Sequence, residues 1–129
     1  MDLTGTKKGL LTKVISGDNF DLPAFINKVQ GFCLGMRLTH WETTNYELHK
    51  AVEMTQASLE DALDAFVEAA IGLNGGNRPT LTGTVTRSED VDGFISFLRT
   101  IGTRDTSLLN IRDEMLQASY KFKYLKGLK

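Results

Sequence analysis

The chain has 129 residues, with 15 basic and 16 acidic side chains and a formal net charge of −1. This length suits one domain with a hydrophobic core, and the balance of charge excludes a strongly basic body that captures nucleic acid by bulk electrostatics. The single cysteine, Cys33, excludes an intramolecular disulfide and a cysteine-rich zinc site. Because we find neither a signal-peptide pattern nor an apolar run of membrane-spanning length, we expect a cytoplasmic protein with no membrane partner.

Residues 1–20 mix charged, apolar and glycine residues without a long periodic pattern. We expect an N-terminal arm there, with a helical turn near residues 10–15. Residues 21–129 are expected to form one helical bundle domain.

A first helix is predicted over residues 22–42. Asp21 can cap its N-terminus, and Pro23 suits its first turn. Apolar side chains then recur at intervals of three and four residues, the period of one helix face. They are Phe25, Val29, Phe32 and Met36.

A second, longer helix is predicted over residues 45–72. Thr44 and Glu47 have the spacing of a capping box at its start, and Gly72 with the glycines that follow suits its end. Between them, apolar and small side chains alternate spacings of four and three, as in the seam of a helical bundle. They are Leu48, Val52, Thr55, Leu59, Ala62, Phe66 and Ala69.

Residues 74–89 are rich in glycine and threonine, and we expect a loop because no second strand is available for pairing. A short helix is predicted over 89–101, with Ser88 and Asp90 as its capping residues, and a longer helix over 105–126. Together these elements predict an all-α fold. We expect an antiparallel four-helix bundle whose third helix is shortened.

His40 and His49 are the only histidines. If the first two helices pack antiparallel across their short connection, both imidazoles lie near the same end of the hairpin. Imidazole is a suitable ligand for iron, zinc and copper. The two histidines therefore form a candidate half of a metal site.

The other half needs carboxylates, and the second helix offers several. Glu53 lies four residues after His49 and shares its helix face, and Asp64 and Glu68 share a face in the same way. Fifteen residues, or about 22 Å of helix, separate His49 from Asp64, so these two side chains cannot bind one ion within one chain. A two-fold dimer with antiparallel copies of this helix can bring them together, in two equivalent sites. Spacing alone equally allows a solvated acidic face and packing histidines.

Three sequence elements resemble the Dps branch of the ferritin-like superfamily. They are His40-Trp41 at the end of the first helix, Tyr46-Glu47-Leu48-His49 at the start of the second, and Asp64 with Glu68 fifteen residues later. The last predicted helix, ending in Tyr120-Lys121-Phe122-Lys123-Tyr124-Leu125, is similar to the last helix of that family. The chain resembles a short, divergent member, because the connection between the histidines and the third helix are both shorter than is usual.

The resemblance implies iron chemistry at a subunit interface. In that family two histidines of one subunit and an aspartate and a glutamate of its two-fold mate bind iron and support oxidation of Fe(II), commonly by peroxide. Carried over, it implies a catalytic set of His40, His49, Asp64 and Glu68. The histidines and Glu68 are metal ligands, Asp64 is a bridge between sites or a water-positioning group, and Glu53 is an accessory acid. The metal is iron, with zinc as a substitute.

Two further interpretations stay open. A ferritin-like scaffold without ferroxidase activity would act as an assembly or binding module. A DNA-binding protein would use lysines of the arm (Lys7, Lys8 and Lys13) or of the C-terminus (Lys121, Lys123, Lys126 and Lys129). For the iron-oxidising protein, which would serve iron storage or protection from peroxide, we expect a homo-oligomer built on a two-fold dimer. The family forms hollow dodecamers, and a chain with a shortened third helix can equally stop at a dimer or form a different cage.

Overall fold

The computed structural model describes residues 20–128, and these form four helices and no strand. The helices are α2 (Leu22–Glu42), α3 (Tyr46–Leu73), α4 (Val91–Arg99) and α5 (Thr106–Lys126). The prediction of an all-helical chain with a short third helix is confirmed, and every boundary lies within two residues of the expected one. The arm expected over residues 1–20 lies outside the described residues, apart from Phe20. Within the described part, no helix is long and apolar enough to cross a membrane.

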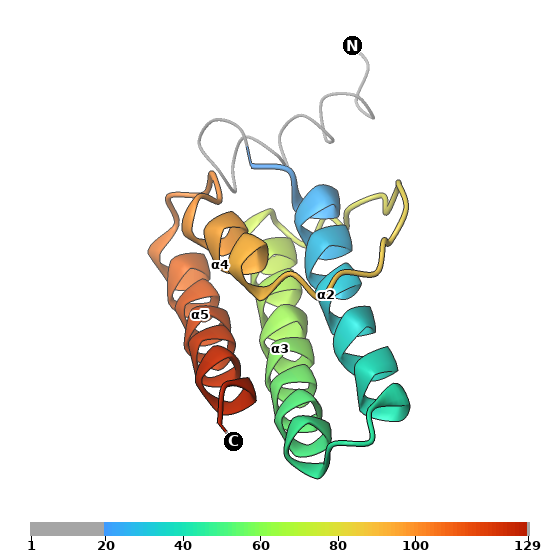
Figure 1. Cartoon of the computed structure of the whole chain (residues 1–129). Helices are drawn as coiled ribbons and strands as arrows, with labels where there is room; N and C mark the ends of the chain where they lie inside the picture. The colour runs from blue at the N-terminus through green and yellow to red at the C-terminus, as the bar shows by residue number, and fades with distance from the viewer. Residues whose placement is uncertain (1–19, 129) are drawn as a thin grey trace.

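The three long helices lie side by side with α3 in the middle (Figure 1). α3 packs against both α2 and α5, whereas the short α4 packs against α5 and, less extensively, against α2. A three-residue turn joins α2 to α3 at the end of the molecule farthest from α4 (Figure 1). The turn therefore places the last residues of α2 beside the first residues of α3.

Each helix begins at a side chain that accepts a hydrogen bond from the first turn. The capping residues are Asp21, Asn45, Asp90 and Asp105. The capping box expected from Thr44 and Glu47 is wrong, because the Asn45 side chain accepts from the backbone N–H of Leu48 at 3.0 Å. Asparagine is as good an N-cap as serine or threonine, and α3 accordingly begins one residue later than the capping box required.

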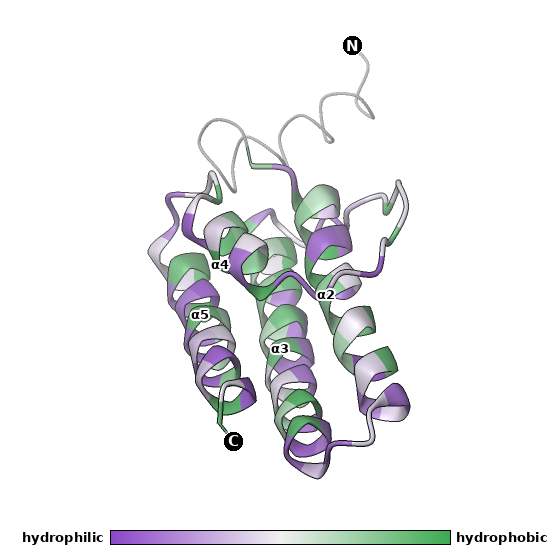
Figure 2. Cartoon of the chain, in the orientation of Figure 1, coloured by the Kyte–Doolittle hydropathy of each residue, from purple (hydrophilic) through white to green (hydrophobic). Residues whose placement is uncertain are grey.

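Phenylalanine rings connect the helices through the core. Phe25 of α2 stacks on Phe66 of α3 with ring centroids 4.4 Å apart, and Phe32 of α2 stacks on Phe94 of α4 at 4.3 Å. All four side chains are buried. Apolar and polar residues alternate along every helix (Figure 2), so each helix contributes one face to this shared core.

The segment of residues 82–89, which we call the strap, lies along α2 and leads into α4 (Figure 1). It was expected to be a loop, and it forms neither helix nor strand. The Asn27 side chain donates a hydrogen bond to the carbonyl of Thr82 at 2.6 Å, and the backbone N–H of Ser88 donates to the carbonyl of Gly31 at 3.1 Å. The strap thus covers a face of α2 that the short α4 leaves open.

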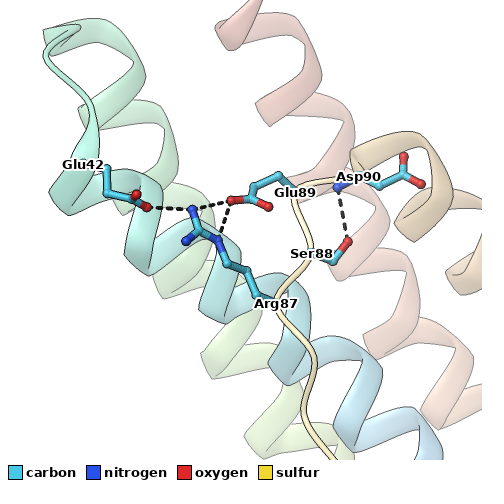
Figure 3. A network of polar contacts seen from close by, with 5 residues as sticks. All are labelled: Glu42, Arg87, Ser88, Glu89 and Asp90. Atoms are coloured by element: carbon cyan, nitrogen blue, oxygen red, sulfur yellow. Dashed lines mark hydrogen bonds and ion pairs between the residues drawn. The ribbon is translucent and has the colours of Figure 1, made fainter.

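An arginine connects the strap to the last turn of α2. The guanidinium of Arg87 contacts the carboxylates of Glu42 and Glu89, each at 2.6 Å (Figure 3). Hydrogen bonds to Glu89 and then Glu42 raise the pKa of Arg87 above its ordinary value. Because this network is exposed, it fixes the position of the strap more than it stabilises the fold.

Two glycines of α2 allow the strap to lie this close. A Cβ atom at Gly31 would overlap the carbonyl oxygen of Thr86, and one at Gly35 would overlap that of Ser88. Both clashes are with backbone, which cannot rotate away as a side chain can. Glycine in the middle of a helix is ordinarily unfavourable, so close packing of the strap explains why it occurs twice here.

We predict that Gly31→Ala and Gly35→Ala each lower the free energy of unfolding by about 1–3 kcal/mol, because the added methyl group displaces the strap. Gly72→Ala is the matched control. No atom lies within 4 Å of a Cβ at that position of α3, so this variant should gain about 0.5–1 kcal/mol from helix propensity. Urea unfolding measures all three values, and equal behaviour of the three variants would contradict the close packing.

Candidate metal centre

The two histidines meet where α2 ends and α3 begins. His40 lies in the last turn of α2 and His49 in the first turn of α3. Their imidazole rings stack, with centroids 3.9 Å apart and an interplanar angle of 22°, and both are half-buried. The expectation that both histidines lie at one end of the α2–α3 hairpin therefore agrees with the structure.

Each imidazole also contacts the backbone of the other histidine. Nδ1 of His49 lies 2.9 Å from the carbonyl oxygen of His40, and Nδ1 of His40 lies 3.3 Å from that of His49. A carbonyl oxygen can only accept, so each contact is a hydrogen bond when Nδ1 of that ring carries the proton, and the geometry favours this tautomer. In a neutral imidazole with this tautomer, the lone pair is on Nε2, and a backbone carbonyl on Nδ1 is a common partner of metal-binding histidines.

The end of α2 explains one of these two contacts, that between the His49 ring and the carbonyl of His40. The last four carbonyls of a helix have no intrahelical partner, and His40 belongs to that final turn. Its carbonyl is satisfied by the ring of His49. The same contact that orients the second imidazole thus also completes the C-terminus of the first helix.

Glu53 joins the two histidines, one helical turn after His49. One ligand atom each from His40, His49 and Glu53 can be chosen so that all three lie within 4.8 Å of one another. Among the described residues this is the one group of three or more potential ligands that close. Two imidazole nitrogens and a carboxylate oxygen suit a transition metal such as iron or zinc, and three ligands leave coordination positions open.

Asp64 and Glu68 do not reach this group within one chain. Both are exposed on α3, which is one uninterrupted helix from Tyr46 to Leu73. Fifteen residues of that helix separate His49 from Asp64, about 22 Å at the usual rise. The structure thus brings together three of the five residues predicted as ligands and leaves the other two on the surface.

Two further residues, Lys50 and Tyr46, lie beside this group, and neither was predicted to have a role in the centre. Nζ of Lys50 lies 3.4 Å from Oε2 of Glu53 and 5.9 Å from the ring centroid of Tyr46. The Tyr46 ring in turn lies 6.4 Å from that of His49. The spacing of three residues between Lys50 and Glu53 was the available signal, because such pairs are neighbours on a helix.

The environment of Cys33 does not support a role as a nucleophile. Cys33 is buried in the core, where desolvation, followed by the nearby charge of Glu60, raises the pKa of its thiol to about 12, despite the opposing effect of Arg37. A thiol with this pKa is not an effective nucleophile at neutral pH, because the thiolate is the reactive form.

The C-terminal lysines are partly engaged within the chain. Nζ of Lys123 lies 2.8 Å from Oδ1 of Asp92, and this pairing raises the pKa of the lysine and lowers that of the aspartate. Nζ of Lys126 lies over the ring of Phe122 at 5.8 Å. Lys7, Lys8, Lys13 and Lys129 lie outside the described residues.

No family model matches this chain, and neither a curated protein nor a solved structure matches it at a significant level. Functional inference therefore rests on the residues of this chain and on the geometry of the centre.

We predict that both histidines, when neutral, carry their proton on Nδ1. Free histidine in water lacks the two carbonyl acceptors that impose this tautomer here. Two-bond ¹⁵N–¹H correlation spectra of the imidazoles distinguish the two tautomers directly. A protonated Nε2 with a bare Nδ1 in either ring would contradict the reciprocal hydrogen bonds.

Proposed function

We propose that this chain is a ferritin-like, iron-binding protein of the Dps type that oxidises Fe(II) at a site shared between two-fold related subunits. The observation that carries the proposal is the group of His40, His49 and Glu53, whose ligand atoms lie within 4.8 Å. The reciprocal hydrogen bonds support it further, because they leave Nε2 of each neutral imidazole free to act as a ligand. Iron storage or protection from peroxide is the role that fits this activity.

In this proposal iron is the substrate. His40 and His49 bind Fe(II) through Nε2, and Glu53 supplies a carboxylate from the same subunit. Two Fe(II) ions give one electron each to hydrogen peroxide, which takes up two protons and becomes two water molecules. The protein residues hold the ions and supply negative charge, which stabilises the trivalent product.

The remaining acids come from the second subunit. Asp64 and Glu68 of the partner subunit complete the site when two α3 helices pack antiparallel, and two-fold symmetry then gives two equivalent sites. Exposure of both side chains supports this, because they are available for contact. The ferritin-like assignment, the antiparallel bundle and assembly beyond a dimer belong to the same proposal.

We predict that His49→Ala and Glu68→Ala each abolish Fe(II) oxidation above the rate in buffer, followed by ferric absorbance after addition of peroxide to anaerobically loaded protein. An equimolar mixture of the two variants, unfolded and refolded together, should recover activity. Half of the random dimers are heterodimers, and each heterodimer pairs the intact His49 of one subunit with the intact Glu68 of the other, so about a quarter of all sites become functional.

Asp61→Asn is the control, since Asp61 is an exposed acid of α3 that lies outside the proposed site; its rate should equal that of the unmodified protein. If the mixture recovers no Fe(II) oxidation although both variants are folded, a shared site is excluded. Oxidation no faster than buffer in the unmodified protein would exclude the ferroxidase and favour the scaffold without this activity.

A further inference from the structure

We propose that Lys50 is a built-in competitor for the metal ion. Its ammonium group pairs with Glu53 in the metal-free centre, weakens binding of the first ion and disfavours the trivalent product more than the divalent substrate. This inference rests on the proposed function, because it concerns the regulation of the same centre.

The position of Lys50 follows from α3. Nζ lies 3.4 Å from Oε2 of Glu53, and both side chains are about half exposed, at 50% and 52%. The same ammonium lies over the Tyr46 ring, 5.9 Å from its centroid. The carboxylate that the metal needs is therefore already paired with a positive charge, in the same stretch of helix that carries His49.

Helix stability does not require this ion pair. Exposed pairs of this kind contribute little, and a glutamate that precedes its lysine supports a helix better than the reverse order found here. A cation near the N-terminal end of a helix also faces the positive end of the helix dipole. The placement is therefore better explained by the centre than by α3 itself.

Coulomb repulsion between the Lys50 ammonium and a bound metal ion weakens metal binding at Glu53. An ion bound to Glu53 lies within a few ångströms of Nζ, and the repulsion rises in proportion to the charge of the ion. The ammonium thus repels a trivalent ion about 1.5 times as strongly as a divalent ion at the same distance. The ammonium already lies over the Tyr46 ring, which can still hold it when Glu53 turns to the ion, so binding is weakened rather than blocked. After oxidation, the stronger repulsion favours departure of Fe(III) and return of the ammonium to Glu53.

The test uses zinc, which binds such ligands but has no redox chemistry, so the readout does not depend on oxidation. We expect Lys50→Gln to bind Zn²⁺ about three- to tenfold more tightly than the unmodified protein at low ionic strength, by isothermal titration calorimetry. The difference should shrink at about 0.5 M salt, because screening shortens the reach of the ammonium charge. Lys50→Arg keeps the charge and should stay within about twofold of the unmodified protein.

Lys28→Gln is the matched control. It makes the same change in net charge, and Lys28 also lies over an aromatic ring, that of Phe97, at 5.9 Å. It is twelve residues before His40, about 18 Å along α2, so its zinc affinity should not change.

The outcomes separate the two proposals. Equal zinc affinity in the unmodified protein and Lys50→Gln, with binding lost in His49→Ala, would overturn the role of Lys50 and leave the metal centre in place. Binding that survives unchanged in His49→Ala, or no binding in any variant, would overturn the centre and with it the role of Lys50. An equal gain in Lys28→Gln would assign the effect to net charge and also overturn the inference.

Discussion

The three-residue turn between α2 and α3 is the constraint on which the candidate centre depends. It is too short to let the two helices diverge, so the last turn of one lies against the first turns of the other. Each of these segments carries one histidine, and each histidine ring contacts a backbone carbonyl on the opposite segment. The same two contacts connect the two helices and favour the tautomer with the proton on Nδ1. A longer turn would relax both together, so folding and ligand orientation are coupled at this end of the molecule.

The shortness of α4 has a separate consequence, along the length of α2. α4 has nine residues and packs mainly against α5 and only slightly against α2, so most of this face of α2 needs another partner. The strap supplies it with backbone rather than side chains, which is possible only because Gly31 and Gly35 carry no Cβ. Arg87 then fixes the strap to Glu42 in the last turn of α2. An extended segment thus covers the part of α2 that α4 does not reach.

The sequence predicts the helices well because each one carries its own local signals. The periodic apolar residues identify the helices. Asp21 with Pro23 defines the start of α2 closely, and the glycines from Gly72 onward define the end of α3. The capping box predicted at Thr44 is wrong because Asn45 is the N-cap instead, and α3 therefore starts one residue later. The strap could not be predicted, since contacts such as that between Asn27 and Thr82 join positions 55 residues apart. A helical glycine gives no indication of which distant segment it accommodates.

For the candidate centre, sequence spacing predicts which side chains share a face of one helix. It does not predict which side chains of two different helices come into contact. Glu53 follows His49 by four residues, and the helical repeat alone places them on one face. The stacking of His40 on His49 required knowledge of how α2 and α3 pack. The pairing of Lys50 with Glu53 obeys the same helical repeat, yet a pattern of charges does not by itself distinguish a ligand carboxylate from an ordinary surface ion pair.

The rigidity of α3 bears differently on the proposed metal binding and on the proposed oxidation of iron. An unbroken helix holds Asp64 and Glu68 at a fixed distance from the histidines, so no local rearrangement of one chain can add them to the centre. Within residues 20–128 a single subunit brings three candidate ligands together, and the carboxylate among them is already paired with an ammonium group. That set suits reversible binding of a divalent ion better than retention of a trivalent one, because it carries a single negative charge that Lys50 opposes. In the proposed function, Fe(III) would therefore need further carboxylates, and from α3 only a second chain could present Asp64 and Glu68. Assembly would then change the charge of the proposed centre, and with it the oxidation state of iron that the centre favours.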